Sequence, residues 1–432
     1  MKSVKTRAII LRRGFLAALL FILAIPFCFA KGKTDAAASP GKTVISFDQF
    51  SGSGDNEVYL KQMIDLYTRA NPNVEIKLQS YGYDDYFMQL TAKIAAGQAA
   101  DVFELNYENF VAYAGRGSLL PLDNIITQAG INTAVYNQKA LEAFSANGRQ
   151  FGVPNSFSNV VLFYNKELFD RAGIAYPTDN WTWADAQAAA KKIRALGPNI
   201  FGYFHPLSFT EFYKTAVQNG GSLLSQDGKQ WTINTPSNIE TVTYLVGLQR
   251  DSNVMPTPEQ LAGMGDWDLF KSGRLGMLVN GIWAFPDFTR DCDFAWDIVV
   301  EPGNKQKATH FFSNGYAINP NSTIPVEAAK FIAFISSDRQ AAQIRVDSGW
   351  ELPPVIDNAI IASYKTKTPP SNREAVFKSL DYLVTPPVIT QFTQLQDIVA
   401  KHLNEAAAGR VTPAEALANM EAECKRVIDL SK

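Results

Sequence analysis

The sequence is short of the residues on which metal centres and histidine catalysis depend, with three histidines and three cysteines among 432 residues. No two cysteines have the Cys-x-x-Cys spacing of a zinc or redox motif. Basic residues are not in excess either, because 40 Lys and Arg face 42 Asp and Glu, for a net charge of −2. Proteins that bind nucleic acid or anionic membranes need a basic surface. We therefore predict no metal, no cofactor and no nucleic-acid partner.

Apolar residues, by contrast, are plentiful. The chain is 46% apolar, 12% aromatic and 19% charged, which is the composition of an ordinary globular protein. A chain of 432 residues is long enough for two domains of typical size, each with its own core.

The first 30 residues read as a signal peptide, followed by a flexible linker over residues 31–42. Residues 15–25 are apolar but too short for a comfortable membrane span, and Ala30 closes an acceptable cleavage site. We expect export to the periplasm or cell envelope. Two alternatives stay open: Arg12 and Arg13 resemble a twin-arginine signal, and Cys28 is a candidate lipid anchor. Of the remaining cysteines, Cys292 and Cys424 could pair, which the sequence does not decide.

Residues 71–110 predict the unit around which the chain is organised. Val74, Ile76 and Leu78 alternate with polar residues as in a strand. A helix should follow from Asp84 or Asp85 to about residue 96, and residues 101–103 form a second, buried strand. A strand–helix–strand unit of this length implies parallel strands. Ligands of open α/β sheets sit beyond the carboxyl ends of such strands, so residues 104–109 are the first place to look for one.

A new α/β series begins near residue 155, which predicts a second lobe. Several segments are informative in combination: 67–76 (YTRANPNVEI), 95–103 (AAGQAADVF), 152–154 (GVP), 162–169 (LFYNKELF), 181–183 (WTW), 273–283 (GRLGMLVNGIW), 313–318 (SNGYAI) and 348–354 (SGWELPP). In this order they resemble the extracellular solute-binding proteins of ABC importers, in the group that binds sugars and oligosaccharides.

The resemblance implies an α/β fold of the periplasmic-binding-protein type II, with two hinged lobes and a ligand cleft between them. Residues 43–154 and 297–366 would form the first lobe, and residues 155–296 and 367–432 the second. The chain would cross between lobes near 154–155, 296–299 and 365–370. Such proteins capture their ligand by lobe closure, deliver it to the transmembrane subunits of an ABC permease and carry out no chemistry. We expect a monomer.

The resemblance also implies a set of ligand contacts on both lobes and at the crossings. They are Phe50, Ser51, Asn106, Tyr107, Glu108, Ser156, Phe157, Ser208, Phe209, Trp283, Asn314, Gly315, Trp350 and Glu351. Relatives often carry an aromatic residue directly after the strand at 101–103, where this chain has Glu104 and Leu105. Tyr107 is the candidate replacement for that platform.

These residue types suit a neutral sugar. Aromatic rings stack on the apolar faces of a pyranose, and carboxylates, amides and hydroxyls bind its hydroxyl rim. A phosphate or carboxylate ligand would call for Arg or Lys, and none of the expected contacts is basic. One stacked ring contributes about 2 kcal/mol, so several hydroxyl bonds must supply the rest of a micromolar affinity.

Two other functions remain open on the sequence. A secreted glycoside hydrolase would need two carboxyl groups roughly 5–10 Å apart, and Asp48, Glu104, Glu108, Asp266 and Glu351 are available. A binding protein for a non-sugar solute, such as an amino acid or peptide, would need an Arg–Asp clamp, which no segment of the sequence suggests.

Overall fold

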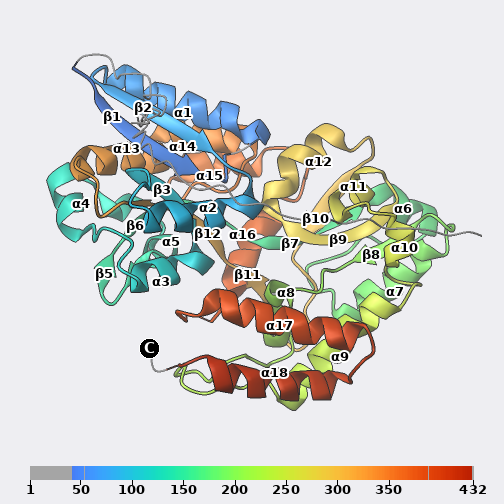
Figure 1. Cartoon of the computed structure of the whole chain (residues 1–432). Helices are drawn as coiled ribbons and strands as arrows, with labels where there is room; N and C mark the ends of the chain where they lie inside the picture. Colours follow the sequence, from blue (N-terminus) through green and yellow to red (C-terminus); the bar gives the residue numbers. More distant parts are fainter. Residues whose placement is uncertain (1–40, 53, 388, 431–432) are drawn as a thin grey trace, which may run out of the picture. The chain divides into compact units, whose positions relative to one another are not determined.

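The computed structural model describes residues 41–430, with the exception of residues 53 and 388. The signal peptide and nearly all of the linker therefore lie outside the described residues, as does Cys28. Two large sheets form the framework of the described chain, beside two short two-stranded sheets (Figure 1). The first has the strand order β2-β1-β3-β12-β6 and the second has the order β10-β7-β9-β8. Within the described residues, no helix is both long and apolar enough to cross a bilayer.

The first sheet contains the predicted organising unit. Its strands are β1 (Thr43–Gln49), β2 (Val74–Ser80), β3 (Val102–Asn106), β6 (Gly152–Ser158) and β12 (Phe312–Ile318). The prediction of parallel strands is confirmed, because β1 pairs in parallel with both β2 and β3. The intervening helix α2 (Tyr83–Ala95) begins slightly earlier than expected, after Gly82 at the N-cap. β3 ends at Asn106, so the loop and helix that follow lie at its carboxyl end.

Helices cover this sheet because their apolar residues recur at helical spacing. In α1 (Glu57–Ala70), Leu60, Met63, Ile64 and Tyr67 are buried, which is the pattern i, i+3, i+4, i+7 of one helix face. They join Phe331 in one hydrophobic core. The other helices of this part are α3 (Tyr107–Gly115), α4 (Asp123–Ala129), α5 (Gln138–Glu142), α13 (Pro325–Ser337), α14 (Arg339–Ser348) and α15 (Asn358–Lys365).

The second sheet consists of β7 (Val160–Asn165), β8 (Phe201–Phe204), β9 (Leu275–Gly281) and β10 (Trp296–Val299). Its helices include α6 (Lys166–Ala172), α7 (Trp183–Arg194), α8 (Phe209–Gln218), α9 (Pro236–Arg250), α10 (Pro258–Leu261), α11 (Asp266–Lys271), α12 (Phe285–Asp291) and α16 (Glu374–Ser379). α7 starts with a capping box in which Thr182 and Asp185 satisfy each other's backbone N–H groups. The sequence spacing Thr-x-x-Asp predicts this cap.

The chain passes between the sheets at three places. β6 belongs to the first sheet and runs through Asn159 directly into β7 of the second. The second crossing differs from expectation, because residues 296–299 pair with β7 as β10, and the chain re-enters the first sheet only at β12. Residues 366–373 form the third passage, from α15 beside α14 to α16 beside β7.

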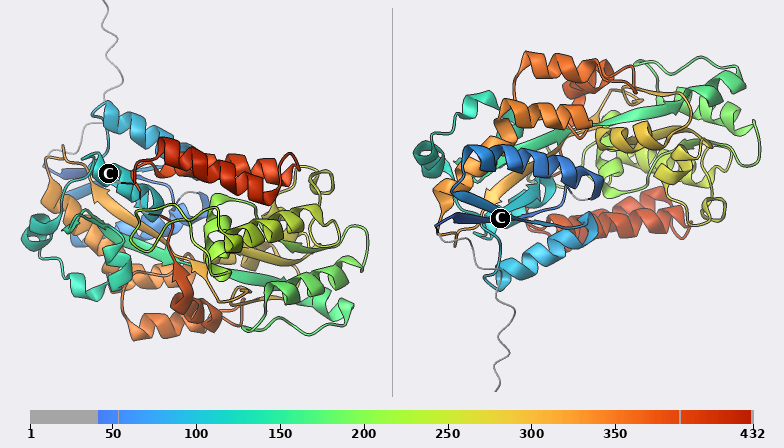
Figure 2. Two further views of the ribbon diagram at one scale, coloured as in Figure 1. Left: turned by 90° about the horizontal axis from the view of Figure 1, so that it is seen from below. Right: turned by 90° about the horizontal axis from the view of Figure 1, so that it is seen from above.

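The C-terminal helices α17 (Phe392–Ala407) and α18 (Pro413–Val427) pack against each other and against α9 (Figure 2). α17 also contacts α3, so the C-terminal hairpin reaches the first lobe. The two cysteines whose pairing the sequence left open are both free: Cys424 is buried in the helical core, and Cys292 is half-buried elsewhere.

Candidate ligand-binding site

The carboxyl end of β3 presents a buried carboxylate that has no protein partner. Glu108 lies in the first turn of α3, is 8% exposed, and neither of its side-chain oxygens makes a hydrogen bond. Burial raises the pKa of Glu108 to about 7. Asn106, the residue before the helix, is occupied: its side-chain oxygen caps α3 at the Asn109 N–H, and its amide donates to the Tyr83 hydroxyl at 3.2 Å. The two polar side chains at this strand end therefore differ, because only Glu108 is left to bind a donor.

Aromatic and proline residues surround Glu108. The Tyr107 ring meets Phe311 edge-on, with ring centroids 5.9 Å apart. Pro386, Pro387 and Ile389, from the segment between β13 (Leu383–Val384) and α17, line the small space around the carboxylate. Tyr107 also lines an open pocket of about 640 Å³, together with residues of α3, α5, α8 and β13 and with Phe311, which follows β11 (Thr309–His310).

The second lobe faces this region through α8. Ser208 caps α8 by accepting the Glu211 N–H at 3.2 Å, so its hydroxyl is partly engaged. Tyr213 lies on the same helix, and the negative charge of Glu108 contributes, after burial, to the raised pKa of Tyr213. Phe209 instead packs against Phe392 of α17 and is 4% exposed. Tyr213, which the sequence did not single out, is thus within electrostatic reach of Glu108.

A buried charged network lies behind Tyr213. The Lys214 ammonium donates to Glu211 at 2.6 Å and also pairs with Glu301. His310 bonds the Tyr213 hydroxyl through Nδ1 at 2.9 Å and Glu211 through Nε2 at 3.1 Å. His205 lies 3.3 Å from Glu211, so His205, Glu211 and Glu301 have ligand atoms close enough to hold a metal.

The Lys214 ammonium already occupies that position, however, because it pairs with both carboxylates. It lowers the pKa of Glu211 against the opposing effect of burial. For His205 burial acts in the other direction and lowers the pKa to about 4. This histidine is therefore neutral at physiological pH. The network holds one ammonium against two carboxylates, and burial raises the pKa of Glu301 to about 7. Its donors are engaged within the network.

Trp283 is the aromatic platform that the sequence favours on the second lobe. It follows β9 and is half-buried, with its ring edge-on to Phe312 at 5.3 Å. Its ring covers Gly281 so closely that a Cβ there would lie 2.1 Å from it. Glycine at 281 is therefore required for this ring position. Phe312, at the start of β12, is a second aromatic that sequence reasoning missed.

A second group of polar side chains lies at the crossing from β6 to β7. Glu351 accepts hydrogen bonds from the hydroxyl of Ser156, from Ser158 at 3.4 Å and from the Asn314 amide at 3.5 Å. Burial raises the pKa of Glu351. Its backbone has φ 46°, a conformation that a residue other than glycine adopts only when its surroundings impose it. Three predicted site residues, Ser156, Asn314 and Glu351, thus meet at the crossing.

Phe157 and Gly315 also lie at the crossing but serve packing. Phe157 exchanges two backbone hydrogen bonds with Leu352, at 3.1 and 3.2 Å, and is 8% exposed. A Cβ on Gly315 would lie 2.7 Å from the Phe144 ring.

Ser51 and Phe50 are tied to a third buried carboxylate, Glu104. Glu104 accepts the backbone N–H groups of Phe50 (3.0 Å) and Ser51 (2.9 Å), the Ser51 hydroxyl, and the Asn155 amide (3.0 Å). Asn155 in turn accepts from Arg345 at 2.7 Å. Glu104 therefore anchors the loop after β1, and the Ser51 hydroxyl is directed inward.

Trp350 lies beside the same group. Its side chain is 2% exposed, and the Arg345 guanidinium lies 4.1 Å from its ring centre. In this structure Trp350 is part of a hydrophobic core and offers no free ring face.

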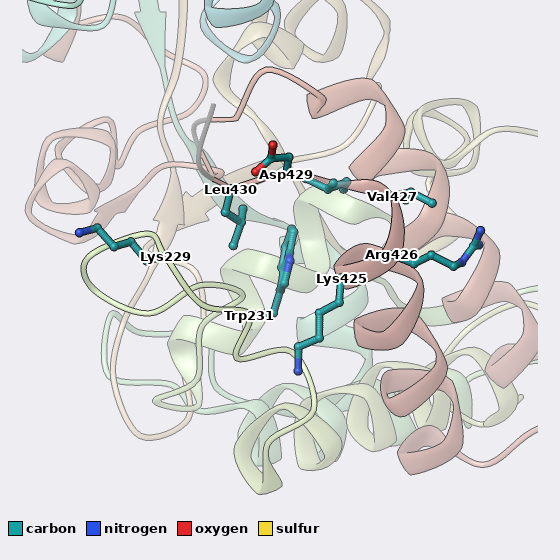
Figure 3. Close-up of a pocket in the computed structure, with 8 residues that line it drawn as sticks. Lys229, Trp231, Lys425, Arg426, Val427, Asp429 and Leu430 are labelled. Carbon is teal, nitrogen blue, oxygen red and sulfur yellow. The ribbon is translucent and has the colours of Figure 1, made fainter.

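Another hollow, of about 800 Å³, lies at the end of α18 and is lined by Lys229, Trp231, Lys425 and Arg426 (Figure 3). It contains none of the expected ligand contacts.

Comparison with known proteins identifies the class. Residues 52–342 match the family described as bacterial extracellular solute-binding protein. The chain belongs to this family, and it is a solute-binding protein of the kind that serves ABC transporters. An ABC substrate-binding protein from Listeria monocytogenes, solved in complex with cycloalternan, is 42% identical with a TM-score of 0.85; the match covers 89% of this chain and 98% of that one.

More distant relatives agree with this assignment. The maltodextrin-binding protein MdxE of Bacillus subtilis is 20% identical over 84% of this chain and 89% of its own length. The arabinooligosaccharide-binding protein of the same organism is 25% identical over 56% of this chain and 54% of its own. The cyclic alpha-maltosyl-1,6-maltose binding protein of Arthrobacter globiformis shares the fold, with 21% identity, a TM-score of 0.71, and coverage of 90% of this chain and 99% of that one. The predicted type II periplasmic-binding-protein fold is confirmed.

Proposed function

We propose that the protein binds a neutral oligosaccharide between its lobes, with Glu108 as the principal acceptor of sugar hydroxyl groups, and that cycloalternan is the first ligand to test. The observation that carries the proposal is the Glu108 carboxylate, which is 8% exposed and has no hydrogen-bond partner. An ionised carboxylate only accepts hydrogen bonds, and leaving it buried and unpaired is costly. Sugar hydroxyls are neutral donors that satisfy it without adding charge.

The other predicted contacts that the structure leaves available have different roles in this proposal. Tyr107 and Trp283 supply ring faces, and Ser208 lies on the opposite lobe from Glu108. The contacts at the crossing, Ser156, Asn314 and Glu351, lie where the lobes hinge. The ligand bridges both lobes, so it binds the closed arrangement better and shifts the population toward it.

The ligands of two similar proteins support cycloalternan as the first candidate. The 42% identical Listeria monocytogenes protein was solved with that compound, and the Arthrobacter globiformis protein is named for a cyclic maltosyl-maltose. We further propose that the protein works as a monomer, exported to the cell envelope, and hands its ligand to an ABC permease. Anchoring through Cys28 remains the alternative to cleavage after Ala30.

The hydrogen bonds and ion pairs of the candidate acids argue against a glycoside hydrolase. Asp48 pairs with Lys93 at 2.7 Å, and Glu104 and Glu351 each accept several protein hydrogen bonds. Three of the five candidate acids are therefore engaged, and the one left besides Glu108 is Asp266, in the first turn of α11 in the second lobe. We infer that the protein does not cleave its ligand.

Calorimetric titration of the mature protein with cycloalternan, maltodextrins and arabinooligosaccharides tests the proposal. We expect one-to-one binding with the sugar recovered intact. Glu108→Gln should weaken binding by about tenfold to a hundredfold, because hydrogen bonds to charged groups are worth about 1.5–3 kcal/mol. Glu167→Gln is the matched control, since Glu167 also lies in the first turn of a helix but is exposed. Equal affinities for both variants would contradict the role of Glu108, and released product would contradict the carrier function.

A further inference from the structure

The third passage between the lobes contains a buried cation without a counter-ion. Arg373 precedes α16 and is 3% exposed. Its Nε donates to the Lys367 carbonyl at 2.9 Å and its Nη2 to the Pro369 carbonyl at 3.2 Å. Among the described residues it forms no ion pair with a carboxylate. Arg373 therefore holds the passage together through carbonyl oxygens alone, and its charge is not neutralised.

Aromatic rings flank the guanidinium on two sides. Its central carbon lies 4.8 Å from the ring centre of Phe285 and 4.7 Å from that of Tyr364. The Tyr364 hydroxyl interacts with the cation, but a neutral phenol is not a counter-ion. Nη1 makes no hydrogen bond of regular geometry. Burial lowers the pKa of Arg373, as expected for a charge that its surroundings only partly compensate.

Arg373 lines a pocket of about 380 Å³ that is built from both lobes and the passage between them. The first lobe contributes Asp55, from the short helix η1 (Gly54–Asn56), and Asp347 of α14; the second contributes Arg290 of α12. Lys367 comes from the passage itself. Arg290 pairs with Asp55, Asp287 and Asp291, and Lys367 pairs with Asp347 at 2.6 Å. These two cations are thus engaged by carboxylates, and Arg373 is the cation of the pocket that has no carboxylate partner.

We propose that this pocket binds a small oxyanion of the phosphate class, which rests against Arg373 and bridges the two lobes. Nε and Nη2 of Arg373 are engaged, so Nη1 is the guanidinium nitrogen left to donate to a phosphate oxygen. Lys367 and Arg290 lie at the same wall and offset the charge of the aspartates there. A cation would meet the uncompensated charge of Arg373, and an apolar molecule would leave that charge unpaired, so an anion is the ligand that pairs with it. The site is separate from the sugar contacts and does not depend on them.

Titration of the sugar-free mature protein with inorganic phosphate, at constant ionic strength maintained with sodium chloride, tests the site. We expect a saturable heat of binding and a melting temperature that rises with phosphate by mass action. Lys367→Met and Arg290→Met should each weaken phosphate binding at least tenfold. Both side chains are partly exposed, at 35% and 51%, so these variants should fold even where replacing the buried Arg373 does not.

Lys330→Met is the matched control. Lys330 is a partly exposed lysine of α13 that pairs with Glu327 and does not line the pocket. Phosphate affinity unchanged in the control and lost in both pocket variants supports the proposal. It is overturned if phosphate does no more than chloride, or if either Lys367→Met or Arg290→Met retains the wild-type affinity.

Discussion

The buried, unpaired Glu108 carboxylate should lower the free energy of unfolding of the ligand-free protein. Burial raises its pKa from 4.5 to about 7, so the folded state binds a proton more tightly than the unfolded chain. Stability is therefore lost as the pH rises from about 4.5 to about 7. Each pH unit between the two pKa values is worth about 1.4 kcal/mol, which gives a cost of about 3 kcal/mol above pH 7.

Glu108→Gln removes this cost, because the amide keeps the shape of the side chain without the charge. We expect the ligand-free variant to be more stable than the wild type at pH 8, by up to about 3 kcal/mol. The figure is an upper bound, since any opening of the lobes hydrates the carboxylate. At pH 4.5 the wild-type side chain is mostly protonated in the folded state, and the two proteins should have the same stability.

Urea unfolding of both proteins at pH 4.5 and pH 8, without sugar, measures the difference. Glu167→Gln again serves as the control, because its carboxylate occupies the same helix position in solvent and should show no such pH dependence. A Glu108→Gln variant that is no more stable than the wild type at pH 8, or that gains equally at both pH values, would refute the reasoning. Gained stability together with lost sugar affinity would be the signature of a binding residue.

Three further substitutions distinguish residues that bind the sugar from residues that stabilise the fold. Trp283→Ala should weaken sugar binding at least about tenfold, or about 1.4 kcal/mol, with little loss of stability; an unchanged calorimetric Kd would exclude the platform role. Trp350→Ala should do the reverse, costing about 3–5 kcal/mol of stability as a buried aromatic when followed by urea unfolding, and a loss confined to affinity would contradict its place in the core. Lys214→Met leaves Glu211 and Glu301 buried without their cation, so it should cost about 3–5 kcal/mol; a urea midpoint equal to that of the wild type would show that the network is dispensable.

The sequence predicted the first α/β unit well because local patterns determine it. The alternation at Val74, Ile76 and Leu78 and the buried run after Asp101 appear as β2 and β3. The second crossing was misplaced for the opposite reason. Residues 296–299 read as a strand, but which sheet a strand joins depends on distant partners, and here β7 takes it into the second sheet.

Aromatic candidates were hard to place from sequence for a similar reason. Trp283 and Trp350 both follow a glycine-containing loop, yet Trp283 is half-buried over Gly281 and Trp350 is enclosed against Arg345. Residue type and spacing do not distinguish these outcomes, because the arginine that encloses Trp350 comes from a helix face. Tyr213 was missed because its position on α8 carries no motif, and only the electrostatic influence of Glu108 on it gives it significance.

Three of the buried glutamates, Glu104, Glu108 and Glu351, show why we expect function to depend on what the fold leaves unpaired. Glu104 fixes the loop after β1 through backbone N–H groups and amides, and Glu351 ties the crossing through two serines and Asn314. In both, each carboxylate oxygen accepts at least one hydrogen bond from the protein. Glu108 has the same chemistry and is also buried, but neither of its oxygens has a partner. Since the folded protein gains nothing from such a carboxylate, its retention points to a donor that the chain does not contain, and a sugar hydroxyl is the donor that adds no charge.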